Sequence, residues 1–277
     1  MNKKLQAFFF GLFLVFSNAN AGYDMSANND KISGTLTTAL DADGSNGVTL
    51  AVWVYKTAAQ WSTVAGDECI ALSNLDSTST SSVIIRTAST ADQIKAGTWS
   101  DSGSLREDVF TFADTTWDDT WVLLVSVYDG NSDREMFVDG TGTGTPHTTL
   151  ADVDTMGFVG IGQSAFSNFS ECEGLVAEAV IFNIALSDTQ VSDLNAGGAE
   201  TALADPCSVA PNNCVGWWSL DTDYGASAGA VLNQATGTAA DATGDLTVIS
   251  AAPFSGATYP NHPHISATNV SSLLVTD

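Results

Sequence analysis

The clearest pattern of hydrophobic positions in the chain lies between residues 117 and 140. From Trp121 to Tyr128 hydrophobic residues occupy both alternating faces, which predicts a strand that is covered on both sides. The segment from Asp129 to Asp133 is rich in residues that tolerate turn conformations, and Met136 to Val138 then return as a second strand. The pattern predicts a long antiparallel hairpin in the middle of a β-rich chain.

Shorter hydrophobic runs predict further strands on both sides of this hairpin. They cover residues 30–40, 48–55, 68–72, 82–86, 105–112, 156–162, 174–183, 215–221 and 246–249. The pattern weakens between Thr57 and Asp114, where we expect long loops. One short surface helix is predicted near Ser187 to Asn195, because Ser187 can cap it while Val191 and Leu194 face the strands.

The first 21 residues have the three parts of a secretory signal peptide. Lys3 and Lys4 precede a hydrophobic run, and small residues follow at Ala19 and Ala21. The hydrophobic run is too short for a membrane anchor. We therefore expect residues 1–21 to be a signal peptide, residues 22–265 to form one domain, and residues 266–277 to be a C-terminal tail.

Several segments, among them residues 29–32 and 48–54, resemble the laminin-G-like, concanavalin A-like lectin and glucanase domains. The central hairpin ends in Met136-Phe137-Val138-Asp139-Gly140, similar to the "YVDG" strand of that family, and residues 174–191 match its "G-x-I-D-E-V-x-I-Y-N-x-A-L-S-x-x-E-I" segment. The departures are Ala177 for aspartate and Gln190 for glutamate. Residues 256–265 look like the closing segment of bacterial and phage-associated members. The resemblance implies an all-β, jelly-roll β-sandwich.

The net charge narrows the classes of partner, and the cysteines suggest disulfides. Without Lys3 and Lys4, six basic residues stand against 32 acidic ones, a formal charge near −26 that disfavours nucleic acid. Four cysteines in an exported chain suggest two disulfides, and three pairings are open. We favour Cys207 with Cys214, which leaves Cys69 to join Cys172 between distant strands.

No catalytic residue can be nominated from the sequence. Retaining glycosidases of this architecture carry two glutamates as E-x-D-x-x-E, about 5 Å apart, and no such string occurs. Glu171, Glu173 and Glu178 come nearest to it. We expect Glu178 to share its strand face with Val176, Val180 and Phe182 and to be a partly buried, partnered acid. The three histidines adjoin prolines, and none has the neighbours of a catalytic triad.

Binding residues are easier to nominate. Aromatic rings in loops can stack on sugars, which makes Trp61, Trp99, Phe166 and Phe169 candidates for ligand binding. Asp129, Asn131 and Asp133 alternate in the hairpin turn, as oxygen ligands of calcium would. Ordinary turn chemistry explains that alternation equally well, so calcium enters as a candidate cofactor.

The sequence thus favours an exported recognition or adhesion module without catalysis, secreted, on the cell surface or in the periplasm. It would bind a glycan or a cell-surface partner through loops at one edge of the sandwich. Two alternatives remain: a structural subunit of a virion or extracellular appendage, and a polysaccharide-active enzyme whose site is not recognised. Fold resemblance does not decide among them.

Overall fold

The computed structural model describes most of the chain from residue 21 to residue 250. The described residues are 21–24, 31–42, 44–62, 69–74, 82–88, 90–100, 105–112, 116–130, 133–143, 155–162, 172–195, 205–218, 229–232, 235, 239–243 and 248–250. The predicted signal peptide up to residue 20, the closing segment 256–265 and the predicted tail 266–277 lie outside them.

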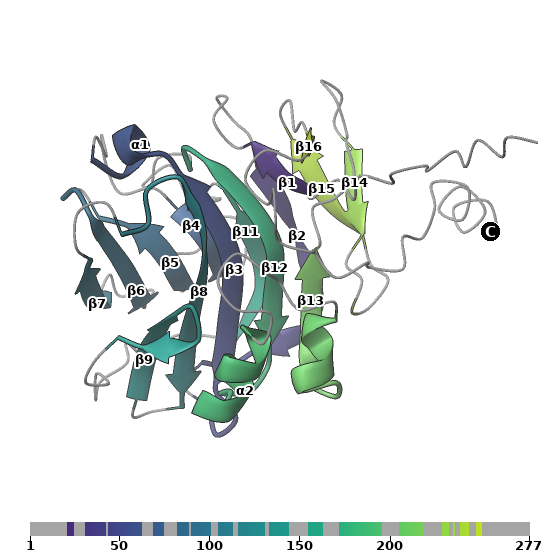
Figure 1. The fold of residues 1–277 in the computed structure, drawn as a ribbon. Coiled ribbons are helices and arrows are strands. Elements are labelled where there is room, and N and C mark those ends of the chain that lie inside the picture. Colours follow the sequence, from purple (N-terminus) through teal and green to yellow (C-terminus); the bar gives the residue numbers. More distant parts are fainter. Residues whose placement is uncertain are drawn as a thin grey trace, which may run out of the picture.

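Two eight-stranded sheets pack face to face, and every pairing between their strands is antiparallel (Figure 1). Sheet A has the order β10 (Thr141–Gly142), β9 (Asp133–Val138), β8 (Thr120–Asp129), β3 (Val48–Lys56), β12 (Leu175–Phe182), β1 (Ala21–Asp24) and β16 (Val248–Ser250), with β13 (Cys214–Trp218) also paired to β12. Sheet B has the order β14 (Gly229–Leu232), β15 (Ala239–Thr243), β2 (Lys31–Leu40), β11 (Met156–Ile161), β4 (Cys69–Asn74), β5 (Ser82–Thr87), β6 (Gln93–Trp99) and β7 (Leu105–Thr111).

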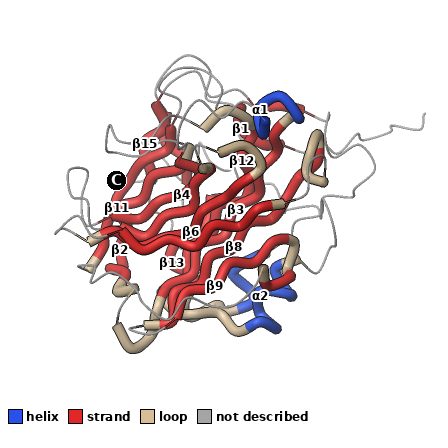
Figure 2. The backbone as a smooth tube through the Cα atoms, turned by 90° about the vertical axis from the view of Figure 1, so that its left-hand side faces the viewer, coloured by secondary structure: helices blue, strands red, loops and turns tan. Residues whose placement is uncertain are grey.

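The predicted all-β jelly-roll sandwich is confirmed by this architecture. Strands dominate the described chain, while the helices α1 (Ala58–Ser62) and α2 (Asp188–Leu194) lie at opposite ends of the sandwich in both views (Figures 1 and 2). A short 3-10 helix, η1 (Pro206–Val209), follows α2. Neither α-helix in the described part has the length or the hydrophobic run that a membrane span needs.

The central hairpin forms where the pattern predicts it. In the pairing of β8 with β9, Leu124 lies opposite Val138 and Asp129 lies opposite Asp133. Every residue of β3 is paired with β8. Both faces of β8 are buried. Leu124 and Tyr128 point into the core between the sheets, whereas Leu123 and Val125 face a second hydrophobic cluster on the outside of sheet A.

Helix α2 supplies part of the cover for that outer face. Ser187 caps the helix and forms a reciprocal capping box with Gln190, so glutamine replaces the family's glutamate without loss of the motif. Val191 and Leu194 are buried against sheet A, as predicted. Gln190 also donates from Nε2 to the carbonyl of Val209 at 3.0 Å, which ties α2 to η1. Helices α2 and η1 therefore cover part of the outside of sheet A.

Candidate functional site

The outward side of β5, β6 and β7 in sheet B is not covered by either α-helix. Cross-strand pairing aligns Arg86 with Lys95 and then Val109, and aligns Gly97 with Glu107. Inward positions such as Ile85 belong to the core, so the alternate positions face outward. We call this surface the β5–β7 face and define it by the outward side chains Arg86, Gln93, Lys95, Trp99, Glu107, Val109 and Thr111.

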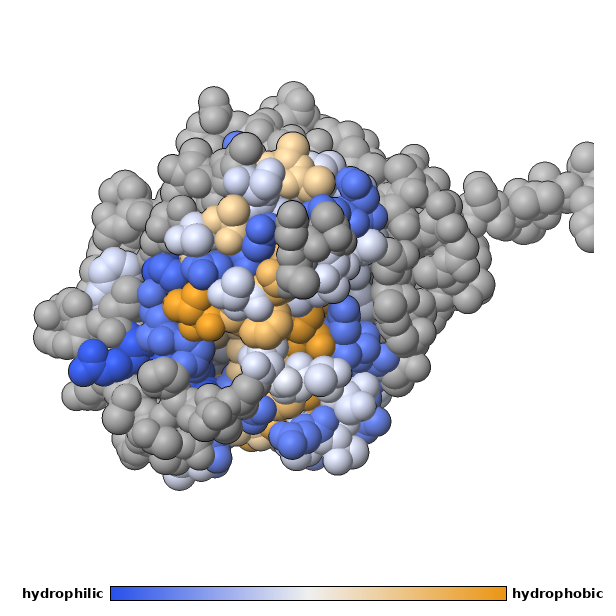
Figure 3. All heavy atoms as spheres, turned by 60° about the vertical axis from the view of Figure 1, so that its left-hand side comes forward, coloured by the Kyte–Doolittle hydropathy of each residue, from blue (hydrophilic) through white to orange (hydrophobic). Residues whose placement is uncertain are grey.

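Polar contacts organise the β5–β7 face. The Arg86 Nε donates to Glu107 Oε1 at 2.6 Å, its Nη2 contacts the same oxygen, and the Lys95 Nζ lies 3.8 Å from Glu107 Oε2. Gln93 Nε2 donates to Thr111 Oγ1 at 3.1 Å in an exposed position. Val109 is 52% exposed. Figure 3 turns the side of β7 and β9 forward, where hydrophobic and hydrophilic residues lie next to each other.

A buried tyrosine supports this face from beneath. Tyr128 reaches across from β8, and its hydroxyl lies 3.1 Å from the Ile84 carbonyl oxygen and 3.0 Å from that of Gly97, to which it donates. Burial raises the pKa of Tyr128 to about 12, because the interior disfavours the phenolate. The neutral hydroxyl therefore joins sheet A to the backbone on which the β5–β7 face is built.

An ion pair closes the edge of the sandwich next to this face. Arg134 on β9 is fully buried; its Nε donates to Asp108 Oδ2 at 2.9 Å and its Nη1 to the Arg106 carbonyl at 2.6 Å. Because β9 lies in sheet A and β7 in sheet B, this arginine joins the two sheets. Strand β7 is thus held by its pairing with β6 in sheet B and by the contacts of Arg134 from sheet A.

Of the two nominated aromatic residues that the structure describes, Trp61 and Trp99, Trp99 lies on this face. Trp99 is half-buried on strand β6, in a segment for which we expected a loop. Trp61 cannot act as an exposed stacking platform, because it is only 1% exposed within α1. Its ring packs edge-on against Phe112 at 5.1 Å, and its Nε1 donates to the Trp117 carbonyl. Phe166 and Phe169 lie outside the described residues.

Sheet A carries a second distinctive group, the buried acid Glu178 on β12. A β-bulge between Ala177 and Val180 interrupts the pairing with β3, and Glu178 takes a φ of +45° there. Such a conformation is costly for a residue other than glycine. Glu178 is 3% exposed, and Trp217 Nε1 donates to its Oε2 at 2.6 Å.

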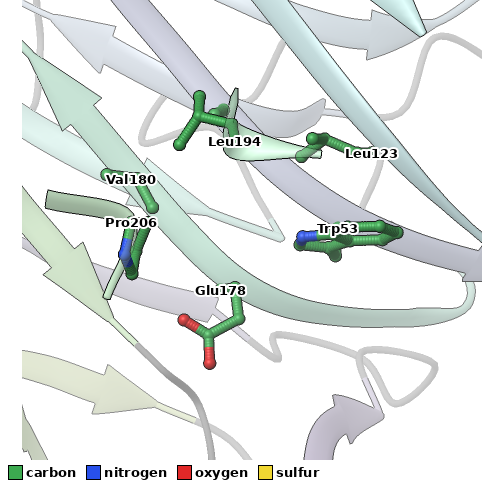
Figure 4. A pocket seen from close by; sticks show the side chains of 7 residues that line it. Trp53, Leu123, Glu178, Val180, Leu194 and Pro206 are labelled. Atoms are coloured by element: carbon green, nitrogen blue, oxygen red, sulfur yellow. The ribbon is translucent and has the colours of Figure 1, made fainter. Parts of the chain in front are cut away.

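The bulge brings Glu178 to a small hollow on the outside of sheet A. Figure 4 shows Pro206 and Trp53 on either side of the Glu178 side chain, with Val180, Leu123 and Leu194 completing the wall. The hollow has a volume of about 10 Å³, close to what one water molecule needs. The surroundings are mainly hydrophobic, and the hollow has no room for a sugar.

The predictions for Glu178 have different outcomes. Its expected burial and its expected partner are both present, the partner being Trp217. The prediction that Val176, Val180 and Phe182 share one face was wrong, because the bulge shifts the alternation. Val176 points into the core between the sheets, while Val180 and Phe182 face outward.

The proposed calcium ligands fall at the tip of the central hairpin. Asp129 ends β8 in an exposed position and pairs across the turn with Asp133 at the start of β9. Asn131 lies outside the described residues. Within the described segments no three histidine, cysteine, aspartate or glutamate side chains are grouped as a metal site would require. Calcium binding at Asp129, Asn131 and Asp133 stays a prediction.

One of the two predicted disulfides is present in the structure, and the other stays a prediction. Cys207 and Cys214 form a disulfide, which fastens η1 to the start of β13. Cys172 is buried in the core, and its backbone amide donates to the carbonyl of Gly162, whose own amide donates to the carbonyl of Ile70. Through these two hydrogen bonds, Gly162 lies between the backbone of Cys172 and that of Ile70, the residue after Cys69. A bond between Cys69 and Cys172 stays a prediction.

The fold is an antiparallel β-sandwich of two packed sheets. The model of the concanavalin A-like lectin/glucanases superfamily matches residues 28–192, and the chain belongs to this superfamily. No curated protein matches the chain by sequence.

Solved structures share the fold at low sequence identity. A Bacteroides ovatus protein that is proposed to bind carbohydrate has 14% identity and a TM-score of 0.57, over 84% of this chain and 60% of that one. The receptor binding domain of botulinum neurotoxin D has 13% identity and a TM-score of 0.52, over 65% of this chain and 46% of that one. The chain spans less than two thirds of the length of these structures.

Proposed function

We propose that the chain is an exported, non-catalytic module that binds carbohydrate through the β5–β7 face, at the β7 edge of the sandwich. The observation that carries the proposal is this face itself. It combines the half-buried ring of Trp99 with hydrogen-bonding groups on Gln93, Lys95 and Glu107 that are fixed by their neighbours. A ring beside ordered polar groups is what a pyranose requires, because its faces are hydrophobic and its rim carries hydroxyls.

The family and the structural neighbours support this proposal. The superfamily includes lectins, and the neighbours named above are proposed to bind carbohydrate or are receptor binding domains. The outside of sheet A is a poorer candidate, because α2 and η1 pack on part of it and the hollow beside Glu178 is too small for a sugar. Sheet B therefore offers the better surface.

A glycan array, read with and without calcium, tests the proposal. Wild-type protein should bind a defined set of glycans, and Trp99→Ala should lower the affinity on the order of tenfold, because a stacked ring contributes about 1–2 kcal/mol. Tyr55→Ala is the matched control, since Tyr55 is a half-buried aromatic residue on sheet A. An array that stays blank at high protein concentration, or equal losses in both variants, would overturn the proposal.

Two further assays address export and catalysis. We expect the chain to leave the cytoplasm when residues 1–21 are present and to stay inside when they are deleted. We also expect no new reducing ends when the protein is incubated with the polysaccharide it binds. Release of reducing ends that disappears with Glu178→Gln or Glu173→Gln would instead establish an enzyme.

A further inference from the structure

Glu107 carries the only carboxylate among the outward side chains that define the β5–β7 face. Its side chain lies over Gly97 and reaches Arg86 on β5. The Arg86 Nε donates to Glu107 Oε1 at 2.6 Å, and the Arg86 Nη2 contacts the same oxygen. Arg86 is only 2% exposed, so its own position is fixed by burial. Arg86 thus occupies one oxygen of the carboxylate and sets the direction of the other.

The second oxygen of this carboxylate, Oε2, is in a different environment. The Lys95 Nζ lies 3.8 Å from it, a distance that suits an ion pair but is too long for a hydrogen bond. Among the described residues no donor hydrogen-bonds to Oε2, yet this oxygen is not one of the buried atoms that lack a partner. Oε2 therefore keeps contact with solvent, and the Glu107 side chain is 13% exposed. It can accept a hydrogen bond from a ligand.

Trp99 lies close enough for one sugar to contact both groups. Gly97 and Trp99 are alternate residues of β6 on the outward side, and Gly97 is paired with Glu107. Two residues along a strand span about 7 Å, which one pyranose ring with its hydroxyls can bridge. A sugar that stacks on the half-buried ring of Trp99 would therefore bring a hydroxyl to Glu107 Oε2.

We propose that the ligand of the β5–β7 face is a neutral glycan, one hydroxyl of which donates to Glu107 Oε2, and that Arg86 is the positioning residue for this contact. The inference rests on the proposed function and narrows it to a class of sugar. An ionised carboxylate or sulfate has no proton to donate, and both Glu107 and the overall charge of −24 repel it. An ammonium group is repelled by Lys95, 3.8 Å from the same oxygen. A neutral hydroxyl meets neither repulsion, and its hydrogen bond to an ionised acceptor is stronger than one to a neutral acceptor.

A glycan array with matched neutral and charged probes tests the class of ligand. The neutral probes are cellotriose, mannotriose, xylotriose and galactotriose. The charged probes are trigalacturonic acid and the trimer of glucosamine. We expect wild-type protein to bind at least one neutral trisaccharide, and to bind both charged probes about tenfold more weakly or not at all.

Analogues of the tightest neutral trisaccharide test the hydroxyl by calorimetry. In each analogue one hydroxyl is replaced by hydrogen or by fluorine, neither of which can donate. At one position both replacements should lower the affinity of wild-type protein about tenfold or more. In Glu107→Gln, Arg86 holds the amide oxygen and leaves the NH₂ group in place of Oε2, so the ratio between parent and deoxy affinities should fall toward one. Arg86→Lys should lower this ratio about threefold, because lysine lacks the planar fork that holds Oε1.

Asp108→Asn is the matched control for Glu107→Gln. Asp108 follows Glu107 on β7 but lies on the opposite side of the strand, opposite the core residue Ala96. Its Oδ2 lies 2.9 Å from the Nε of the buried Arg134. The control therefore removes the same charge and also disturbs an ion pair with a buried arginine. It should leave the ratio between parent and deoxy affinities unchanged, even where it lowers stability.

Each outcome decides the inference. A neutral preference, with one hydroxyl that matters in wild type and Asp108→Asn but not in Glu107→Gln, supports it. Charged probes that bind as tightly as neutral ones, or no position at which both replacements lower affinity, overturn it in wild-type protein alone, whether or not a variant folds. An unchanged ratio in folded Glu107→Gln also overturns it, and an unchanged ratio in Arg86→Lys overturns the positioning role. In these cases carbohydrate binding that is lost in Trp99→Ala still stands, whereas a blank array overturns the proposed function as well.

Discussion

The side chains of Arg86 and Glu107 meet above Gly97, although they come from strands that are not neighbours. Arg86 lies on β5 and Glu107 on β7, with β6 between them, and the guanidinium Nε lies 2.6 Å from the carboxylate Oε1. A Cβ atom on Gly97 would lie 2.9 Å from Glu107 Cγ. The missing side chain of Gly97 thus makes room for the ion pair that organises the β5–β7 face.

Gly97→Ala should therefore destabilise the protein by about 1–3 kcal/mol and weaken carbohydrate binding. The new methyl group would also lie 2.9 Å from the carbonyl oxygen of Arg106, which is backbone and cannot move aside as a side chain would. Urea unfolding measures the change. Gly157→Ala is the control, since a Cβ there meets nothing within 4 Å and should change stability by less than about 0.5 kcal/mol. Equal effects of the two substitutions would contradict this description of Gly97.

The raised pKa of Tyr128 predicts a loss of stability in alkali. The pKa rises from 10.0 to about 12 on folding, so the folded state holds its proton more tightly than the unfolded state. The resulting stabilisation, about 2–3 kcal/mol, is fully present below pH 10 and disappears as the pH rises toward 12. Tyr128→Phe should lack this component. Urea unfolding of both proteins between pH 8 and about 12 checks it, and a constant difference between them would contradict the assignment.

The structural role of Glu178 predicts a contrast between two substitutions. Glu178→Ala leaves the buried Nε1 of Trp217 without that acceptor and should reduce stability by about 1–3 kcal/mol. Glu178→Gln keeps an acceptor oxygen and should reduce stability less. Neither should change the affinity for carbohydrate, measured by calorimetry on the folded fraction. Loss of binding in a stable Glu178→Gln protein would instead place Glu178 in the site.

Peptide mapping under non-reducing conditions tests the cysteine assignments. We expect Cys207 joined to Cys214 and Cys69 joined to Cys172 in protein exported to an oxidising compartment. The small loop closed by Cys207 and Cys214 should contribute about 2–3 kcal/mol, because loop closure entropy grows slowly with length. A Cys207→Ser, Cys214→Ser protein should therefore unfold at lower urea concentration. Any other pairing would contradict the prediction.

The segments with strong alternation or a local motif could be predicted from sequence. The β8–β9 hairpin, the buried strand β3 and helix α2 with its Ser187 cap all depend on residues close together in the chain. The double-sided burial of β8 was predictable for the same reason, because hydrophobic residues on both faces require cover on both faces. The resemblance then implied the jelly-roll sandwich, but the order in which the strands pair comes from the structure.

The missed features depend on long-range contacts. Strand β6 contains Lys95, Gly97 and Thr98, which carry little hydrophobic signal, and it forms because β5 and β7 pair with it on both sides. Trp61 was nominated as an exposed ring because its segment was predicted to be a loop. It instead lies in helix α1, where it packs against Phe112. The bulge at Glu178 has no sequence signature, so the side to which Glu178 points could not be predicted.

A map of backbone amide chemical shifts during titration with a glycan from the array tests the central claim most directly. The claim is that the β5–β7 face binds carbohydrate. We predict that the shifts concentrate on β5, β6 and β7 and include the indole proton of Trp99. Shifts that concentrate instead on α2 and η1, or none at saturating glycan, would contradict the account.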